Sequence, residues 1–298
     1  MRLKRAQAQK KAYQSNDVMM CMVHLKAGVE ITRPINCLFA GISALAALYI
    51  ENSTLLSVLS PAGFFTILSV SLLCAAGNIV NDYFDLESDM INKPKRPIPS
   101  GRIQKNEAMA LGIILAIIGI SASFHLNISA FILAIINLTV LYTYSRIKQK
   151  TPFGNFVVAY LAGSVFLFGG IAAGSIEKVW ILALLSGLAT LAREITKDIE
   201  DVRGDKFRKT TLATYYGDKT AGIIAGVVLI FAIFLSILPL EMYLFGKNYL
   251  YVIFVADCIF AYCAYRLVAD PTKYASDNSR LEKVGMWVAL AAFIAGTI

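Results

Sequence analysis

Nine long apolar stretches run through the 298-residue sequence, and most are near the length that an α-helix needs to cross a membrane. About 20 apolar residues in a helix span the hydrocarbon core of a bilayer, which is about 30 Å thick. Only 16% of the residues are charged, against about 25% in soluble domains. The sequence therefore predicts an all-α, polytopic membrane protein. The expected transmembrane helices cover residues 28–50, 61–83, 107–124, 127–145, 153–173, 178–196, 219–239, 247–268 and 283–298.

The basic residues indicate how these helices are oriented. When successive helices alternate in direction, all of the 28 Lys and Arg residues except Lys178 and Lys247 fall on one side. Because basic loops stay in the cytoplasm, we expect a cytoplasmic N-terminus and, with nine helices, an external C-terminus in the cell membrane. We also expect a basic cytoplasmic lead over residues 1–22 and a single transmembrane domain over residues 23–298. Basic residues confined to short loops do not form the face that a nucleic acid would need, so nucleic acid is not an expected partner.

An acidic motif marks the end of the second apolar stretch. Asp82, Asp85 and Asp89 are spaced i, i+3 and i+7, which places three carboxylates on one face of a helix, and Asn78 lies one turn earlier on that face. The same acidic spacing recurs at residues 198–205, 116 positions later, at the end of the sixth stretch. Both copies are expected on the cytoplasmic side of the membrane.

The positions of the two acidic motifs also suggest an internal duplication. Each motif closes the second helix of a four-helix unit, and an even number of helices lets both units enter the membrane in the same direction. The sequence therefore predicts two repeats, residues 28–145 and 153–268, and a ninth helix at 283–298.

Carboxylates gathered in this way favour a divalent metal site. Six of them close together would repel one another unless cations compensate their charge. Mg²⁺ prefers oxygen ligands and typically joins one or two carboxylates to the phosphates of a substrate. Solvated helix ends are the alternative explanation, and the repeat at matched positions argues against it. The predicted ligands of a two-metal diphosphate site are Asn78, Asp82, Asp85, Asp89, Asp198, Asp201 and Asp205.

Basic residues surround both acidic motifs. Lys93 and Arg96 follow the first motif, whereas Arg193 and Lys197 lie on the helix that carries the second. Cations mixed with carboxylates are typical of a site that holds an anionic ligand through metal ions and side chains together. The general excess of basic residues in cytoplasmic loops is an alternative explanation for those beyond the helix ends. It does not explain Arg193 and Lys197, because these two lie on the helix itself.

Two further segments carry candidate residues at the helix ends. Tyr144 and Lys148 are one turn apart, so an aromatic ring that stabilises positive charge and a cation could face one ligand. An interfacial tyrosine beside a lysine that reaches the surface is the alternative. Arg33 and Asn36 lie where the first helix begins, and either a phosphate contact or a topology signal would account for Arg33. Asp257, inside the eighth stretch, belongs to none of these motifs.

Together these motifs resemble those of the UbiA-type intramembrane prenyltransferases. The resemblance rests on the Asn-Asp-x-x-Asp-x-x-x-Asp segment at 81–89, its acidic counterpart at 198–205, the proline-rich segment 92–101 and the pair at 144 and 148. It implies nine transmembrane helices around a central, lipid-open cavity that both acidic loops cap on the cytoplasmic side. It also implies Mg²⁺ and a polyprenyl diphosphate donor.

The amino-acid sequences of residues 32–37 and 197–201 are most similar to those of family members that use geranylgeranyl diphosphate and a lipid-like glycerol phosphate acceptor. Prenylation of an aromatic ring is the alternative activity. A divalent-cation transporter is the alternative class, although transporter sites usually lie at the membrane midplane rather than at helix ends. The expected catalytic residues are Tyr144, Lys148, Arg193 and Lys197. The expected substrate-binding residues are Arg33, Asn36, Asn81, Lys93, Arg96, Arg146 and Asn155.

Overall fold

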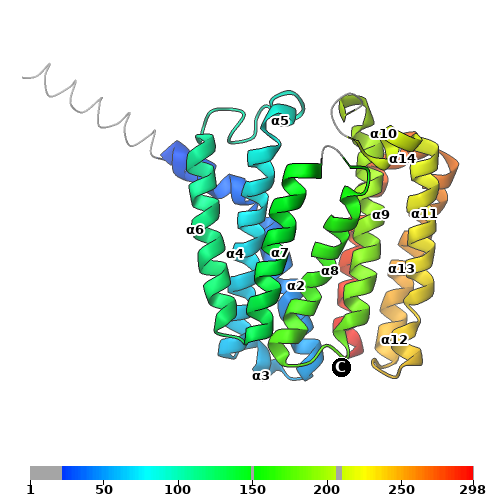
Figure 1. Ribbon diagram of the computed structural model, residues 1–298. Helices are drawn as coiled ribbons and strands as arrows, with labels where there is room; N and C mark the ends of the chain where they lie inside the picture. Colours follow the sequence, from blue (N-terminus) through cyan, green and yellow to red (C-terminus); the bar gives the residue numbers. More distant parts are fainter. Residues whose placement is uncertain (1–21, 149–150, 206–209, 298) are drawn as a thin grey trace, which may run out of the picture.

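Helices account for all the regular secondary structure in the described part of the chain. The computed structural model describes residues 22–148, 151–205 and 210–297, except for the side chains of 203–205. Residues 22–32 form a first helix, and the others follow as an upright bundle (Figure 1). They are α2 (Pro34–Asn52), α3 (Leu55–Val58), α4 (Pro61–Phe84), α5 (Leu86–Asn92), α6 (Lys105–Phe124), α7 (Ile128–Ile147), α8 (Gly154–Ala173), α9 (Val179–Asp205), α10 (Leu212–Tyr216), α11 (Asp218–Leu235), α12 (Leu238–Glu241), α13 (Lys247–Ala269) and α14 (Pro271–Gly296).

Eight of the described helices are long and apolar enough to cross a membrane, namely α2, α4, α6, α7, α8, α9, α11 and α13. This confirms the predicted all-α, polytopic architecture. The ninth expected helix begins earlier than predicted, because α14 starts at Pro271. Its first half is rich in charged residues, so α14 does not meet the composition of a membrane helix over its length. The count of nine transmembrane helices and the two repeats stay predictions.

Three further helix boundaries differ from the expected ones, and one of them is the end of α11, which was expected at 239 and lies at Leu235. The first stretch was expected to be one helix over 28–50, but Arg33 adopts a left-handed conformation with φ 52° and separates residues 22–32 from α2. Proline disfavours the right-handed helical conformation in the residue before it, so Pro34 starts a new helix. The sixth stretch was expected to end at 196, whereas α9 continues to Asp205. The second acidic motif is therefore helical throughout.

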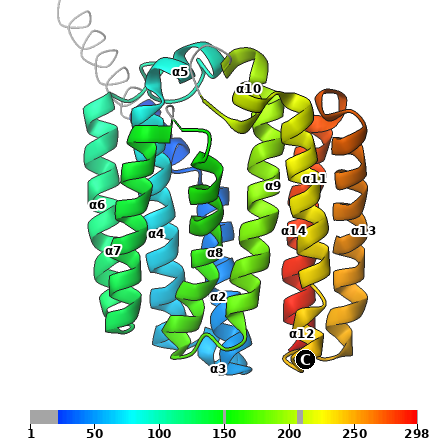
Figure 2. The same ribbon diagram turned by 45° about the vertical axis from the view of Figure 1, so that its right-hand side comes forward.

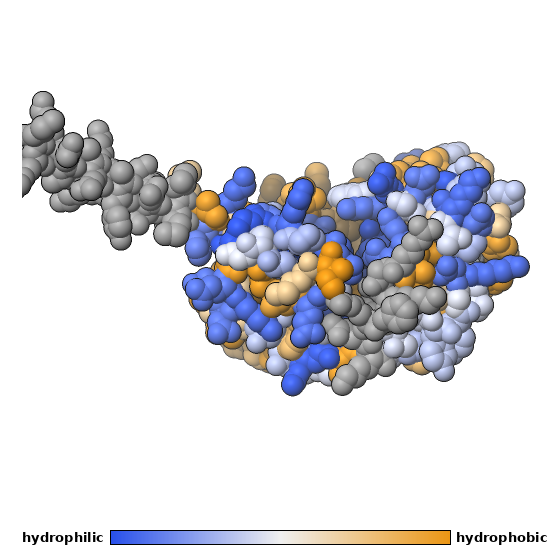
Figure 3. All heavy atoms as spheres, turned by 90° about the horizontal axis from the view of Figure 1, so that it is seen from above, coloured by the Kyte–Doolittle hydropathy of each residue, from blue (hydrophilic) through white to orange (hydrophobic). Residues whose placement is uncertain are grey.

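Both acidic motifs lie at the same end of the bundle. Figures 1 and 2 show α5, which follows the first motif, beside α10, which follows the second, at the upper end. The last helix, α14, ends at the opposite end. Seen from above, the motif end is mainly hydrophilic, with scattered hydrophobic residues (Figure 3).

Lys178, one of the two basic residues expected on the far side, has a structural role there. Its Nζ donates to the backbone oxygen of Ile50 at 3.4 Å and to Ser53 Oγ at 2.8 Å, where α2 ends. Its backbone N–H donates to Glu51 Oε2 at 3.1 Å. A cation near the last carbonyl groups of a helix satisfies them and complements the helix dipole. Lys178 thus ties the start of α9 to the end of α2.

Small residues allow close packing between α2 and α8. A Cβ atom added at Gly169 would lie 2.1 Å from the backbone oxygen of Ala44 and 2.7 Å from Ala47 Cβ. Both alanines are fully buried. Membrane helices without a hydrophobic driving force between them depend on such close backbone contact.

We expect Gly169→Ala to destabilise the protein by about 1–3 kcal/mol, because an added methyl group forces α2 and α8 apart in a packed interface. The shift of the thermal unfolding midpoint in detergent measures this. Gly28→Ala is the matched control, since an added Cβ there meets nothing closer than Leu111 Cδ2 at 3.9 Å. Equal midpoints for the two variants would contradict the close packing of α2 and α8.

Candidate functional site

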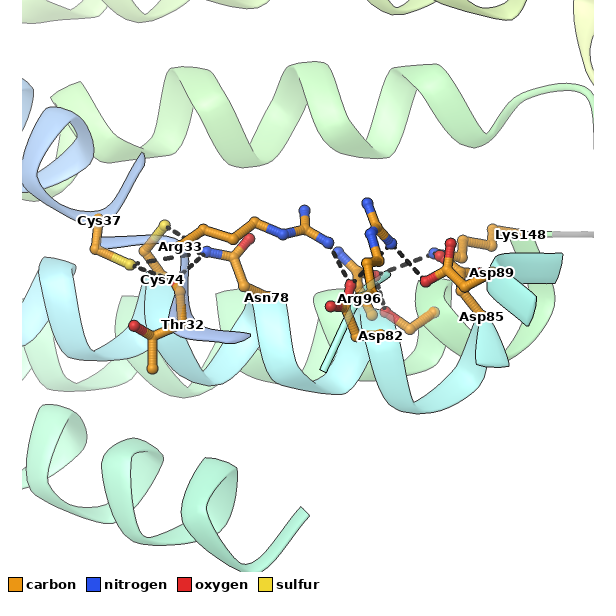
Figure 4. Close-up of polar contacts among 12 residues, drawn as sticks. Thr32, Arg33, Cys37, Cys74, Asn78, Asp82, Asp85, Asp89, Arg96 and Lys148 are labelled. Atoms are coloured by element: carbon orange, nitrogen blue, oxygen red, sulfur yellow. Dashed lines mark hydrogen bonds and ion pairs between the residues drawn. The ribbon is translucent and has the colours of Figure 1, made fainter. Parts of the chain in front are cut away.

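The carboxylates of the first acidic motif are paired with arginine side chains. Asp82 and Asp89 are only 3% and 5% exposed. Arg33 and Arg96 both pair with Asp82, and Arg96 Nη1 is 3.1 Å from Asp82 Oδ1. The same Arg96 Nη1 lies 2.5 Å from Asp89 Oδ2, so one guanidinium joins two carboxylates (Figure 4). Buried charges are tolerated only when they are paired, and these pairs meet that requirement.

The end of α7 completes this cluster with a lysine. Lys148 is buried, and its Nζ lies 2.6 Å from Asp85 Oδ2 and 3.3 Å from Asn81 Oδ1. Ser145 Oγ donates to the same oxygen of Asn81 at 2.6 Å. Lys148 Nζ is 5.8 Å from the centroid of the Tyr144 ring. The structure therefore brings the predicted tyrosine–lysine pair to the first acidic motif.

The proline-rich segment is fastened to the helix at residues 22–32. Arg102 donates to both carboxylate oxygens of Glu30, at 2.5 and 2.9 Å, and to the backbone oxygen of Lys95 at 2.6 Å. The hydrogen bond from Arg102 lowers the pKa of Glu30. Within the same segment, Arg96 reaches Asp82 and Asp89, whereas Lys93 is exposed.

The second acidic motif has a different environment. Asp198 is buried and accepts a hydrogen bond at 2.7 Å from Asn155 Nδ2 of α8, whereas Asp201 is exposed. Asp205 ends α9, but its side chain lies outside the described part of the chain. Lys148 and Asn155 are seven positions apart in the sequence, and each contacts one motif. The connection from α7 to α8 thus links the two motifs.

Arg193 and Lys197 share a counter-ion that the sequence interpretation missed. Glu194 Oε1 lies 3.1 Å from Arg193 Nη1, and Glu194 Oε2 lies 2.8 Å from Lys197 Nζ. The spacing of Glu194 and Lys197, i and i+3 on one helix, could have indicated this pair. Their positive charge is therefore partly offset.

Residues of α14 hold the same part of α9 in place, and no local pattern indicated them. Thr196 Oγ1 donates to Glu282 Oε1 at 3.0 Å, and Ser279 Oγ donates to Glu200 Oε2 at 3.2 Å. Arg193 Nε donates to the backbone oxygen of Ser279 at 3.2 Å. Glu282 is fully buried. The contacts join residues 79 to 86 positions apart, so only the tertiary structure shows them.

Three predicted site residues lie outside this cluster or contact it differently. Asn36 and Arg146 are exposed, and the Arg146 guanidinium is 5.9 Å from the Tyr142 ring centroid. Asn78 Nδ2 donates to the backbone oxygen of Thr32 at 2.9 Å rather than to an aspartate (Figure 4). Asn78 therefore links α4 to the break before α2.

The donor atoms of the cluster fit Mg²⁺. Carboxylate and amide oxygens are the hard ligands that Mg²⁺ prefers, and Asp82, Asp85 and Asp198 supply them at one end of the bundle. In the described residues, no three His, Cys, Asp or Glu side chains are arranged as a metal site. The aspartates of the first motif instead hold guanidinium and ammonium groups.

An apolar cavity of about 350 Å³ extends below the first motif. This volume is within the usual range for ligand sites, about 300–1,000 Å³. Asn78 and Asn81 of α4 line the cavity, and apolar residues supply most of the remaining wall. The wall comes from α2, α4, α7, α8, α9, α11, α13 and α14. The predicted central cavity is therefore present, with polar residues of the first motif at one end.

Comparison with known proteins identifies relatives over nearly the whole chain. The model of the UbiA prenyltransferase family matches residues 37–293. Digeranylgeranylglyceryl phosphate synthase of Methanocaldococcus jannaschii is 41% identical over 280 residues, which cover 93% of this chain and 98% of that protein. The enzyme of the same name from Methanosarcina mazei is 38% identical, with coverage of 91% and 98%.

Solved structures show the same fold. A solved structure of digeranylgeranylglyceryl phosphate synthase is 40% identical to this chain in sequence. The match covers 92% of this chain and 99% of that chain, and the two superpose with a TM-score of 0.79. A UbiA homolog from Archaeoglobus fulgidus bound to GPP and Mg²⁺ is 16% identical, with coverage of 90% and 99% and a TM-score of 0.61. The similarity to the Archaeoglobus fulgidus protein shows the fold alone.

Proposed function

The chain belongs to the UbiA prenyltransferase family, and on this premise we propose that it transfers a geranylgeranyl group from geranylgeranyl diphosphate to geranylgeranylglyceryl phosphate. The free hydroxyl of the acceptor forms the second ether bond of an archaeal-type membrane lipid. The names of the relatives that are about 40% identical support this choice of donor and acceptor. Within the structure, one observation carries the proposal. A buried cluster of carboxylates and cations lies at one end of an apolar cavity.

This arrangement matches an amphiphilic substrate. The diphosphate would lie among the charged groups, and the isoprenoid chain would extend into the apolar cavity. Mg²⁺ would be held by Asp82, Asp85, Asp198 and Asp201, and Asp89 would help to orient the first motif because it shares Arg96 with Asp82. When bound, Mg²⁺ neutralises the charge of the diphosphate and helps it to leave.

Side chains of the cluster act on the reacting bond. As the bond between C1 and the diphosphate oxygen breaks, Lys148 offsets the growing negative charge, and Tyr144 presents its ring to the allylic cation. Arg193 and Lys197 add positive charge around the second motif, reduced by their shared Glu194. The oxygen of the acceptor hydroxyl then bonds to C1, and its proton passes to the released diphosphate. Arg33 and Arg96 lie at the first motif and supply cations for phosphate oxygens.

We place this site on the cytoplasmic side of the membrane. Nearly all basic residues fall in the loops at that end, which supports a cytoplasmic N-terminus and an external C-terminus. Geranylgeranyl diphosphate, the lipid-like acceptor and the surrounding lipid are therefore the expected partners.

Transfer by membranes that contain the protein tests this function. Labelled geranylgeranyl diphosphate is supplied with geranylgeranylglyceryl phosphate or with an aromatic ring acceptor, and the products are separated by chromatography. We expect label in the glycerol lipid, loss of transfer with EDTA, and recovery when Mg²⁺ is added back. Label in the ring acceptor alone would refute the lipid assignment. If vesicles that contain the protein take up a divalent cation and no labelled product forms, the hypothesis that the protein is an enzyme is refuted.

The position of the Tyr144 ring gives a further prediction. A Cβ atom added at Gly154 would lie 2.9 Å from Tyr144 Cε2. We expect Gly154→Ala to displace the ring and lower kcat roughly ten-fold, because small misplacements of reacting groups have large kinetic effects. Gly246→Ala is the control, since nothing lies closer than 3.7 Å to its added Cβ. An unchanged kcat for Gly154→Ala would contradict the role of the ring.

A further inference from the structure

A buried glutamate in the first half of α14 contacts the helix that carries the second acidic motif. Glu282 is 0% exposed, and its Oε1 accepts a hydrogen bond at 3.0 Å from Oγ1 of Thr196 in α9, which is also fully buried. The other carboxylate oxygen, Oε2, is buried without a hydrogen-bond partner in the described part of the chain. Burying a carboxylate is unfavourable compared with burying an apolar side chain of similar size. The presence of Glu282 therefore points to a role other than stability.

Contacts from α14 reach one face of α9 over two helical turns. Arg193 Nε donates to the backbone oxygen of Ser279 at 3.2 Å, and Ser279 Oγ donates to Glu200 Oε2 at 3.2 Å. The contact between Thr196 and Glu282 lies between these two. Positions 193, 196 and 200 are spaced i, i+3 and i+7, which places them on one face of the helix. The face of α9 turned to α14 is therefore fixed by polar contacts.

The acidic side chains of the second motif lie on a different face of α9. Asp198 follows Thr196 by two positions, which corresponds to about 200° around an α-helix. Asp198 accepts a hydrogen bond at 2.7 Å from Asn155 of α8. A hydrogen bond tolerates a narrower range of distances and angles than an apolar contact. A rotation of α9 that breaks the contact with α14 therefore also displaces the acidic face.

The polar half of α14 is itself attached to α13. Asn278 is fully buried, and its Nδ2 donates to the backbone oxygen of Cys263 at 2.9 Å. Arg266 Nη2 lies 3.3 Å from Asp277 Oδ2. Asn278 and Glu282 are one turn apart, so α14 connects α13 to α9 through neighbouring side chains. Glu282 therefore holds α9 against a fixed support.

We propose that Glu282 is a positioning residue, which fixes the rotation of α9 through its hydrogen bond to Thr196. This rotation determines how Asp198 and Asp201 are presented to Mg²⁺ and the diphosphate. The inference rests on the proposed function. Residues that orient the ligands of a metal typically change metal affinity or activity by about 10–100-fold when they are replaced.

The Mg²⁺ requirement of Glu282→Leu tests this role. We expect the Mg²⁺ concentration for half-maximal transfer to rise about ten-fold. Without Mg²⁺, the unfolding midpoint in detergent should stay close to that of the wild type. An apolar replacement of a buried charge is often neutral, and the Thr196 hydroxyl keeps its contact with the backbone oxygen of Ala192 at 3.0 Å. Glu282→Gln keeps an acceptor oxygen and should stay within about two-fold of the wild type.

A binding measurement without turnover gives a second readout. Mg²⁺ with inorganic pyrophosphate should raise the unfolding midpoint of the wild-type protein, because a ligand that binds the folded state stabilises it. Glu282→Leu should need about ten-fold more Mg²⁺ for the same rise. A residue that only stabilises the fold would lower the midpoint itself and leave this Mg²⁺ dependence unchanged.

Thr196 supplies the matched variants. Thr196→Val removes the donor with little change in shape, so it should raise the Mg²⁺ requirement as far as Glu282→Leu does. The double variant should raise it no further, since both changes remove the same hydrogen bond. Thr196→Ser keeps the hydroxyl and should resemble the wild type. Thr66→Val is the control, because Thr66 is fully buried in α4 and its Oγ1 has no hydrogen-bond partner in the described residues.

The outcomes separate this proposal from the proposed function. If the wild-type protein transfers no geranylgeranyl group, the proposed function fails. If it does so but Glu282→Leu leaves the Mg²⁺ requirement unchanged, the positioning role is refuted. An equal shift for Glu282→Gln or for Thr66→Val would also refute it. Should Glu282→Leu fail to insert, Thr196→Val carries the test, and an unchanged Mg²⁺ requirement there overturns the proposal.

Discussion

Replacing Asp82 with asparagine should lower geranylgeranyl transfer about a thousand-fold, or roughly 4 kcal/mol of transition-state stabilisation. Asp82 is buried and pairs with both Arg33 and Arg96. Asparagine keeps the shape of the side chain but removes the negative charge that a metal–diphosphate complex needs. Both arginines are partly exposed, so water can solvate them and the variant should still fold.

The Asp82→Asn experiment needs two readouts. Initial rates over a range of Mg²⁺ concentrations report the metal role, and the unfolding midpoint in detergent reports structural damage. Glu87→Gln is the matched control, because Glu87 is an exposed acid on the neighbouring helix α5 (Leu86–Asn92). Normal rates for Asp82→Asn at every Mg²⁺ concentration would refute the metal role. A rate loss matched by equal loss of folded protein would assign Asp82 to structure instead.

Local signals in the sequence were enough to place most helices. Ser60 before Pro61 and Asn127 before Ile128 cap the helices α4 and α7 at the positions where the apolar stretches were expected to begin. Such caps depend on residues within a few positions of one another, so local sequence captures them. The expectation that Asp82, Asp85 and Asp89 lie on one face of a single helix was wrong, because α4 ends at Phe84, Asp85 lies between the helices and Asp89 belongs to α5.

Contacts between distant residues could not be predicted in this way. The fully buried Glu282 holds Thr196 from 86 positions away, and polar residues in the first half of α14 concealed that helix from a hydropathy argument. The left-handed Arg33 reaches Asp82, 49 positions later, because the chain breaks before Pro34. The tertiary packing decides which residue becomes the partner of a buried charge. Such ion pairs between distant positions therefore cannot be predicted from the local sequence.

The partners of Lys148 make it the most informative cation to remove. Its Nζ contacts Asp85 at 2.6 Å and Asn81 at 3.3 Å, so it lies at the first acidic motif, beside the cavity that Asn81 lines. A cation in this position stabilises a leaving diphosphate more than it stabilises the bound substrate. The role therefore predicts a loss in kcat rather than in donor affinity.

We expect Lys148→Met to lower kcat about a hundred-fold, or roughly 2.7 kcal/mol, with little change in KM for the donor. Methionine keeps the apolar length of the side chain, and Ser145 still donates to Asn81 at 2.6 Å, so the end of α7 should stay in place. Lys148→Arg should recover part of the rate because it restores the charge. Lys105→Met is the control, since Lys105 is an exposed lysine at the same end of the bundle, 4.2 Å from the Tyr83 ring centroid. A rise in KM with kcat unchanged would show that Lys148 binds donor and transition state equally, and no rescue by arginine would favour a purely structural role.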